Sequence, residues 1–136
     1  MVYVKEFSGF KEMLASLDED ILEIKRVLGE LLRRMEVLRV RAENERALKD
    51  VLSKMGISQT QGQVSNVVNL KKVKVIIKPT TEQELISLEE FVEYLTSRMI
   101  LLESIKKELS LFSTTNIEAK IEVIYVDGLP KEIYVK

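Results

Sequence analysis

The sequence predicts an α+β protein dominated by one long amphipathic helix. Three observations support this fold class: apolar residues recur every seven positions from Phe7 onward, apolar and charged residues alternate over 67–78 and 117–135, and a second helical pattern lies between those two stretches. The 136 residues are most simply one domain, 1–136. Within it we expect a long helix at 7–54 and a sheet-and-helix part at 67–136.

A heptad repeat with apolar a and d positions predicts the long helix. With Phe7 as position a, the repeat continues for five heptads and fails at Glu45 and Lys49. Gly56 is suited to cap the end of the helix. A helix over 7–54 would be about 70 Å long at about 1.5 Å per residue, longer than a small domain needs. The a positions are Phe7, Leu14, Ile21, Leu28, Met35 and Ala42, and the d positions are Phe10, Leu17, Ile24, Leu31 and Leu38.

The elements that follow are marked by turn residues and by a change of period. Residues 56–66 contain two glycines and a polar cluster, and we expect a loop there. The alternation over 67–78 predicts a strand that ends at Pro79. A capping box at 81–84 then starts a second helix that runs to about Phe112.

The C-terminal stretch 117–135 predicts a β-hairpin, since Asp127 and Gly128 form a favoured turn pair between two alternating segments. Residues 113–116 break the second helix before it. Pro130 lacks a backbone donor, so the last strand is expected at a sheet edge. The expected order is α-β-α-β-β, with a small three-stranded sheet in which the strand at 67–78 runs parallel to the first strand of the hairpin. Its apolar face is expected to lie against the second helix and consists of Val73, Val75, Ile77, Ile121 and Val123.

Charge segregation favours an antiparallel pairing of the two helices within the chain. The second half of the first helix is basic and faces the acidic start of the second helix, while its acidic first half faces the basic end of the second. A parallel pairing of two copies through the heptad seam would instead place Arg34 near Arg39 and Arg41 near Arg46. The shorter second helix is expected to leave part of the apolar seam uncovered.

An uncovered stripe of leucines is typical of a binding surface. We therefore expect a non-enzymatic scaffold or assembly subunit that self-associates through the long helix, most simply as a dimer, or binds a protein partner. Leu17→Glu or Leu31→Glu is expected to weaken that association, because a buried seam tolerates charge poorly. The candidate interface residues are Phe10, Leu14, Leu17, Ile21, Ile24, Leu28 and Leu31.

The composition argues against most enzyme classes. The chain has no His and no Cys, which removes Ser-His and Cys-His nucleophile pairs and thiolate zinc sites. No glycine-rich phosphate loop follows a strand. We expect no catalytic residues, cofactor or metal. No apolar run is long enough to span a membrane, so a cytoplasmic protein is expected. The abundance of Ile, Val, Glu and Lys would suit a thermophile.

A nucleic-acid-binding module is the alternative function. It would use a lysine-rich strand and the arginine-rich half of the first helix, and its binding would fall steeply with salt. The net charge of −1 gives no general attraction to nucleic acid, and no aromatic residue lies between the lysines to stack on bases. Lysines on a strand also protect against aggregation. The candidate contacts are Arg33, Arg34, Arg41, Lys71, Lys72 and Lys74.

A long antiparallel helical pair combined with strands is similar to the arrangement of prefoldin-type chaperone subunits. Those proteins place their strands between the two helices, whereas here a hairpin at 117–135 follows the second helix. The similarity therefore does not extend to the end of the chain, and no motif assigns it to that family.

Overall fold

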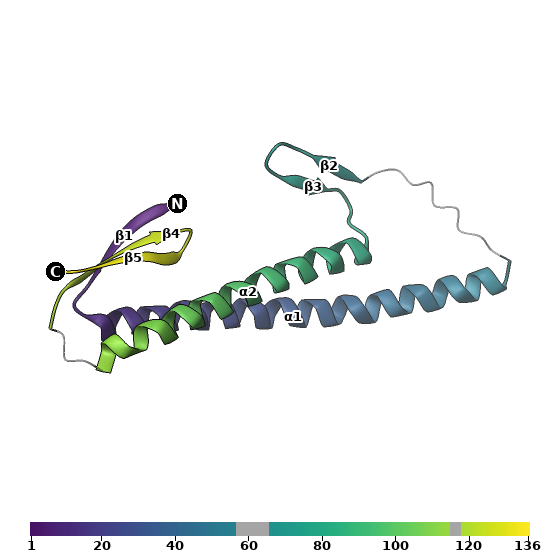
Figure 1. The fold of residues 1–136 in the computed structure, drawn as a ribbon. Coiled ribbons are helices and arrows are strands. Elements are labelled where there is room, and N and C mark those ends of the chain that lie inside the picture. Colours follow the sequence, from purple (N-terminus) through teal and green to yellow (C-terminus); the bar gives the residue numbers. More distant parts are fainter. Residues whose placement is uncertain (57–65, 115–117) are drawn as a thin grey trace. The chain divides into compact units, whose positions relative to one another are not determined.

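The computed structural model describes residues 1–56, 66–114 and 118–136, and it confirms the α+β class (Figure 1). The described residues form two compact units, which we call the terminal unit (1–29 and 94–136) and the central unit (30–93). Both helices contribute to both units. In chain order the elements are β1 (Val2–Phe7), α1 (Phe10–Lys54), β2 (Val67–Asn69), β3 (Lys74–Ile76), α2 (Thr81–Thr114), β4 (Ile121–Val126) and β5 (Leu129–Val135).

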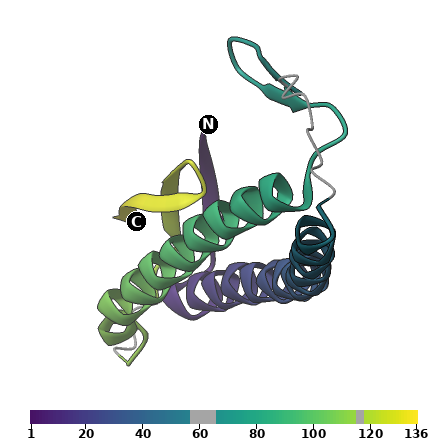
Figure 2. The same ribbon diagram turned by 90° about the vertical axis from the view of Figure 1, so that its right-hand side faces the viewer.

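The terminal unit contains the three-stranded sheet, which is antiparallel throughout and ordered β1-β4-β5 (Figures 1 and 2). Val2 lies opposite Val126 and Phe7 lies opposite Ile121. Along β4 every second side chain is buried, because one face of the sheet packs on the helices of this unit. The buried core there consists of Phe7, Phe10, Met13, Leu17, Ile21, Leu102, Ile121, Val123 and Tyr125.

The first strand was not predicted, and it changes the expected element order. The prediction that the long helix begins at Phe7 was wrong, because Phe7 ends β1 and α1 begins at Phe10. Ser8 and Gly9 separate the two elements. The hydroxyl of Ser8 and its backbone N–H both donate to the Glu12 carboxylate, the N–H at 2.7 Å. These two bonds satisfy a donor just before the helix and lower the pKa of that carboxyl.

The capping box of α2 lies one residue earlier than predicted. The Thr80 hydroxyl accepts from the N–H of Gln83 at 3.1 Å, and the N–H of Thr80 donates to the Gln83 side chain at 3.0 Å. Gln83 also exchanges two side-chain hydrogen bonds with Asn66, at 2.7 and 2.8 Å. These bonds fix the segment that enters α2, which begins at Thr81.

The antiparallel pairing of the two helices is confirmed in each unit. In the central unit Met35 and Leu38 of α1 pack on Leu88 of α2, and in the terminal unit Leu17 shares a core with Leu102. Ion pairs connect residues further along α1 with residues nearer the start of α2, as the charge segregation predicted. They are Asp18–Lys106 at 2.5 Å, Lys25–Glu103 at 3.9 Å, Arg34–Glu84 at 3.8 Å and Arg46–Glu82 at 3.8 Å.

The prediction of one strand at 67–78 within the three-stranded sheet was wrong. This segment folds back on itself as a separate two-stranded hairpin, β2–β3, in the central unit. Lys71 and Lys72 form its turn, which the N–H of Leu70 closes by donating to the carbonyl of Val73 at 3.0 Å. The parallel crossover is therefore absent, and the third strand of the sheet is β1.

Two further predictions concern the segments around 57–65 and 115–117, which lie outside the described residues. The loop predicted at 56–66 falls almost wholly there, as do Ile117 at the start of the predicted hairpin and the last residues of the helix break. Within the described residues the hairpin is confirmed as β4–β5, with β5 at the sheet edge. Its turn residues Asp127 and Gly128 both have positive φ, 52° and 79°.

Candidate interaction site

The candidate interface residues of the heptad seam are used within the chain. Leu17 is fully buried in the core of the terminal unit, and Phe10, Ile21 and Leu28 are also buried. The remaining three, Leu14, Ile24 and Leu31, are half-buried and pack against the two cores. Their use between copies stays a prediction, and it would require α2 and the sheet to move away from α1.

A second apolar face of α1 is exposed in the central unit. Six residues on it follow each other at intervals of three, four, four, three and four, and we call them the α1 stripe. At about 100° per residue they lie within an arc of about 80°, on the side away from Met35 and Leu38. The apolar members are more than half exposed, with Leu48 at 59% and Met55 at 68%. The α1 stripe consists of Val37, Val40, Asn44, Leu48, Val51 and Met55.

The α1 stripe has an eleven-residue period, whereas the covered seam has a seven-residue period. Val37 recurs as Leu48, Val40 as Val51, and Asn44 as Met55. An eleven-residue repeat corresponds to about 3.67 residues per turn, close to the ideal helix, so the stripe drifts little around α1. Two faces of one helix thus carry two independent apolar patterns. This repeat is visible in the sequence, but it covers a shorter stretch than the heptad pattern and is therefore the weaker of the two signals.

Charged residues border the first half of the α1 stripe with opposite signs. Glu36 and Glu43 lie along one side, and Arg34 and Arg41 lie along the other. All four side chains are exposed. Arg34 also lies 3.8 Å from Glu84 of α2. The two sides are therefore complementary in charge, which matters for how two such faces would pair.

The hairpin β2–β3 has one wholly apolar face, which is exposed. Val68 lies opposite Val75, so both side chains lie on the same face, and Leu70, Val73 and Ile77 extend it along the alternation. All five are more than two-fifths exposed, with Leu70 and Val73 at 60%. We call these five residues the hairpin face. The expectation that Val73, Val75 and Ile77 lie against the second helix was wrong, whereas Ile121 and Val123 of β4 are buried as expected.

The six candidate nucleic-acid contacts are all exposed and all belong to the central unit. The three arginines lie on α1, and Arg34 is paired with Glu84. Lys71 and Lys72 form the hairpin turn, and Lys74 lies on the hairpin side opposite the apolar face. Residues 51–81 contain no Asp or Glu, so this segment is uniformly basic.

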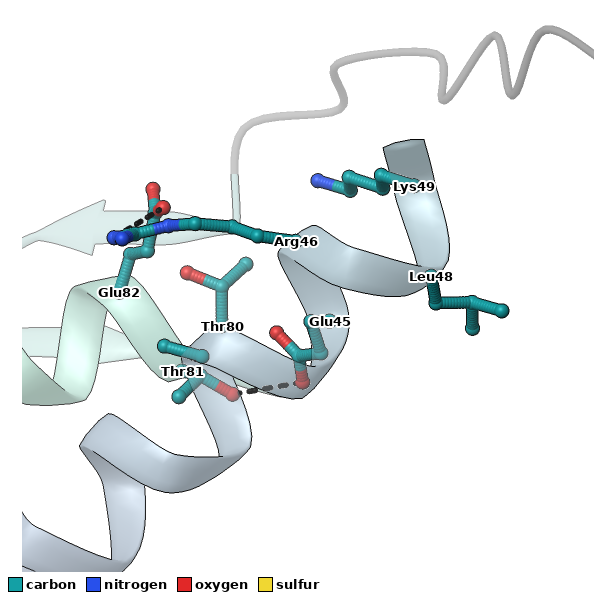
Figure 3. Close-up of a pocket in the computed structure, with 8 residues that line it drawn as sticks. Glu45, Arg46, Leu48, Lys49, Thr80, Thr81 and Glu82 are labelled. Carbon is teal, nitrogen blue, oxygen red and sulfur yellow. Dashed lines mark hydrogen bonds and ion pairs between the residues drawn. The ribbon is translucent and has the colours of Figure 1, made fainter. Parts of the chain in front are cut away.

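A shallow pocket lies where the start of α2 meets α1 in the central unit (Figure 3). Its polar groups already contact one another. The Thr81 hydroxyl donates to the Glu45 carboxylate at 3.0 Å, and Arg46 lies 3.8 Å from Glu82. These contacts stabilise the helix junction, and they leave both carboxylates engaged within the chain.

One buried polar group stands out in the terminal unit. The Tyr125 ring stacks on Tyr3 with centroids 4.9 Å apart, and its hydroxyl is buried without a hydrogen-bond partner among the described residues. Burial, with smaller effects of Tyr3 and Asp20, raises the pKa of Tyr125 to about 12. Burial also raises the pKa of the Asp20 carboxyl. The raised pKa keeps the phenol protonated above about pH 10, where a solvated tyrosine would begin to ionise.

Neither a metal centre nor a membrane span is found in the part of the chain that the structure describes. Its His, Cys, Asp and Glu side chains do not gather in groups of three or more that would hold a metal ion. Its helices are not both long and apolar enough to cross a membrane. Comparison with known proteins gives no match to a family model, to a curated protein or to a solved structure.

Proposed function

We propose that this protein is a non-enzymatic assembly subunit that self-associates through the α1 stripe. The observation that carries the proposal is the exposure of this stripe, a regular apolar repeat that the chain's own α2 leaves uncovered. Exposed single apolar residues are common on protein surfaces, but a continuous row is typical of an interaction site.

The charges beside the stripe favour a second copy as the partner, in parallel orientation. In a parallel pair, opposite sides of the two stripes face each other, and Glu36 of one copy then meets Arg41 of the other, five residues further along. The two-fold symmetry of the pair produces this contact twice. An antiparallel pair that covered the whole stripe would reverse the direction, so Glu36 would instead lie near Lys54, which borders the stripe on the glutamate side.

Asn44 supports the same orientation. A single polar residue in an otherwise apolar seam lowers stability but fixes register, because its amide is satisfied only when it meets a polar partner. In a parallel, in-register pair, Asn44 meets the Asn44 of the other copy. An out-of-register pair would bury the amide against apolar side chains.

The test measures the mass of the purified protein by light scattering over a wide concentration range. We expect a dimer that dissociates on dilution, and we expect Leu48→Glu to make the protein monomeric throughout. Leu32→Glu is the matched control, since Leu32 is also exposed on α1 in the central unit but lies about 120° from the stripe. A parent that is monomeric at every concentration, or a Leu48→Glu variant as associated as Leu32→Glu, would refute the proposal.

Orientation is tested by charge reversal. Glu36→Arg alone places like charges together across a parallel pair and is expected to weaken it, while Glu36→Arg combined with Arg41→Glu restores the pairing. In an antiparallel pair the added Arg41→Glu would not restore association, because Glu36 would face Lys54 there. Labels attached near residue 55 of each copy, with energy transfer between them, provide an independent check.

Nucleic-acid binding is the second candidate, because the acid-free segment 51–81 places exposed lysines on the hairpin. Fluorescence anisotropy with labelled duplex and single-stranded oligonucleotides at two salt concentrations tests it. Binding at low salt that falls steeply with salt would support this function. Absence of binding at low salt would exclude this function.

A further inference from the structure

The hairpin β2–β3 leaves much of its polar backbone and its apolar side chains without a partner among the residues that the structure describes. It is two-stranded, and isolated two-stranded hairpins are at best marginally stable in water. Its apolar face of five branched side chains is exposed, and both strands are edges of the hairpin. Such a face is expected to be covered in the working assembly.

Lysine positions show which contacts the hairpin face permits. Lys74 lies on the opposite side of the hairpin, and Lys71 and Lys72 lie at the turn, so none of them interrupts the apolar face. They nevertheless give the hairpin a net positive charge, because residues 51–81 contain no Asp or Glu. Two hairpin faces packed on each other would bring these like charges together. The partner is therefore expected to be apolar and acidic.

The sheet of the terminal unit has a matching face. One face of this sheet packs on the helices, and the register of β1, β4 and β5 places alternate residues on the other, which we call the outer sheet face. Val2 and Val4 are exposed there, at 66% and 55%, and Ile124 and Val126 are half-exposed beside them. Three glutamates, Glu6, Glu122 and Glu132, lie on the same face, and Lys136 offsets one of them through its ion pair with Glu122 at 2.5 Å.

We propose that the hairpin face of one copy packs on the outer sheet face of a second copy. The contact joins a basic, apolar surface to an acidic, apolar one, and sheet faces pack on each other about 10 Å apart with their side chains interdigitating. Because the two surfaces differ, the contact is head-to-tail and extends an assembly beyond two copies unless it closes into a ring. It is separate from the α1 stripe.

A lipid surface fits the hairpin less well than a protein face does. The strand edges carry N–H and C=O groups that a hydrocarbon environment cannot satisfy. The lysines at the turn would also be the first residues to enter a membrane if the hairpin inserted tip first. A protein sheet face leaves the strand edges in water or within reach of other polar groups.

The experiment uses two charge-reversed variants of the full chain. Lys71→Glu with Lys72→Glu alters the turn of the hairpin (the hairpin variant), and Glu6→Lys with Glu132→Lys alters the outer sheet face (the sheet variant). All four residues are exposed, so the fold is expected to persist. We expect each double variant to weaken assembly beyond the dimer about tenfold, as measured by sedimentation over a concentration range at low salt. Val73→Thr with Val75→Thr, which keeps β-propensity, is expected to act in the same direction.

The sheet variant by itself distinguishes the proposed contact from a contact between two hairpins, because it leaves the hairpin unchanged. Mixing the two double variants then tests complementation. The unaltered acidic sheet of the hairpin variant matches the unaltered basic hairpin of the sheet variant, and the reversed hairpin matches the reversed sheet, so the mixture is expected to recover hairpin–sheet contacts. The chain carrying all four changes is expected to recover assembly.

The same variants made with Leu48→Glu separate this inference from the proposed function. If the Leu48→Glu chain still associates in a concentration-dependent way, and adding the hairpin changes abolishes that association, the inference is supported. This holds even if the α1 stripe is not the dimer interface. Three results would overturn it: a parent that never exceeds a dimer, double variants that assemble like the parent, or a mixture that recovers nothing. The inference would also be overturned if the chain with all four changes recovers a contact that does not depend on concentration. The hairpin would then pack on the sheet of its own chain.

Discussion

Leu17 and Leu48 lie on the same helix, but we expect Leu17→Ala to destabilise the fold and Leu48→Ala to weaken association between copies. Leu17 has no exposed surface and is packed among Met13, Leu102 and the inner side of the sheet, whereas Leu48 is 59% exposed. Leu17→Ala is expected to lower the free energy of unfolding by about 3 kcal/mol, from lost burial and the cavity it leaves. In a chain of this length that corresponds to a fall of about 10 °C in Tm.

Leu48→Ala is expected to change the unfolding free energy of the monomer by about 0.5 kcal/mol or less, since little of its surface is buried in the chain. It should instead weaken the dimer. Burying the exposed part of one leucine contributes about 1 kcal/mol, and two-fold symmetry counts it twice, so the Kd is expected to rise about thirtyfold.

Urea unfolding followed by tyrosine fluorescence and by circular dichroism measures both effects. All four tyrosines lie in the terminal unit, so their fluorescence reports the unit that contains Leu17, while circular dichroism reports the helices of both units. Repeating each experiment at several protein concentrations separates folding from association. A cost for Leu17→Ala that disappears on dilution would mean that Leu17 is buried between copies, and the reasoning about the two faces of α1 would fail.

Three further predictions follow from single contacts. Tyr125→Phe is expected to leave stability unchanged or raise it by about 1 kcal/mol in chemical denaturation, because the buried hydroxyl has no hydrogen-bond partner among the described residues; a clear loss of stability would reveal one. The pKa of about 12 for this phenol lies above its unfolded value near 10, so its contribution to stability is complete below about pH 10 and is lost as the pH rises toward 12; stability titrations of parent and Tyr125→Phe should diverge only in that range. Gly128→Ala is expected to cost about 1 kcal/mol in thermal unfolding, since φ is +79° and a Cβ would lie 2.6 Å from the Arg98 guanidinium; an unchanged Tm would show that the turn relaxes. Asn44→Val is expected to strengthen association in light scattering while loosening register in the energy-transfer measurement, and weaker association would contradict the role given to Asn44.

Local patterns predicted the helices and the last hairpin well, because these elements are determined by neighbours in sequence. The heptad repeat of α1, the turn at Asp127 and the opposite charges of the helices all have short-range or regular signatures. The start of α2 was displaced by one residue, since Thr80 and Thr81 are equally suited to cap it and only the contacts of Gln83 decide between them.

Strand pairing was predicted poorly, because it depends on which distant segments meet. The segment 67–78 was expected to extend the sheet, yet Val2–Phe7 takes that place and 67–78 pairs with itself around Lys71 and Lys72. The lysines break the alternation there, a signal that two short strands explain better than one long strand. The candidate interface was likewise placed on the seam of α1 that α2 covers, since a heptad pattern does not reveal which chain fills it.

The division into units has a consequence for the order in which the chain folds. The central unit is a single continuous stretch, 30–93, whereas the terminal unit needs both 1–29 and 94–136. During synthesis the central unit is complete while β1 still lacks its partner β4, whose Val126 pairs with Val2. Contacts so distant in sequence form slowly. Until they form, β1 is an unpaired strand edge, so newly made chains are most vulnerable to misassembly at this strand.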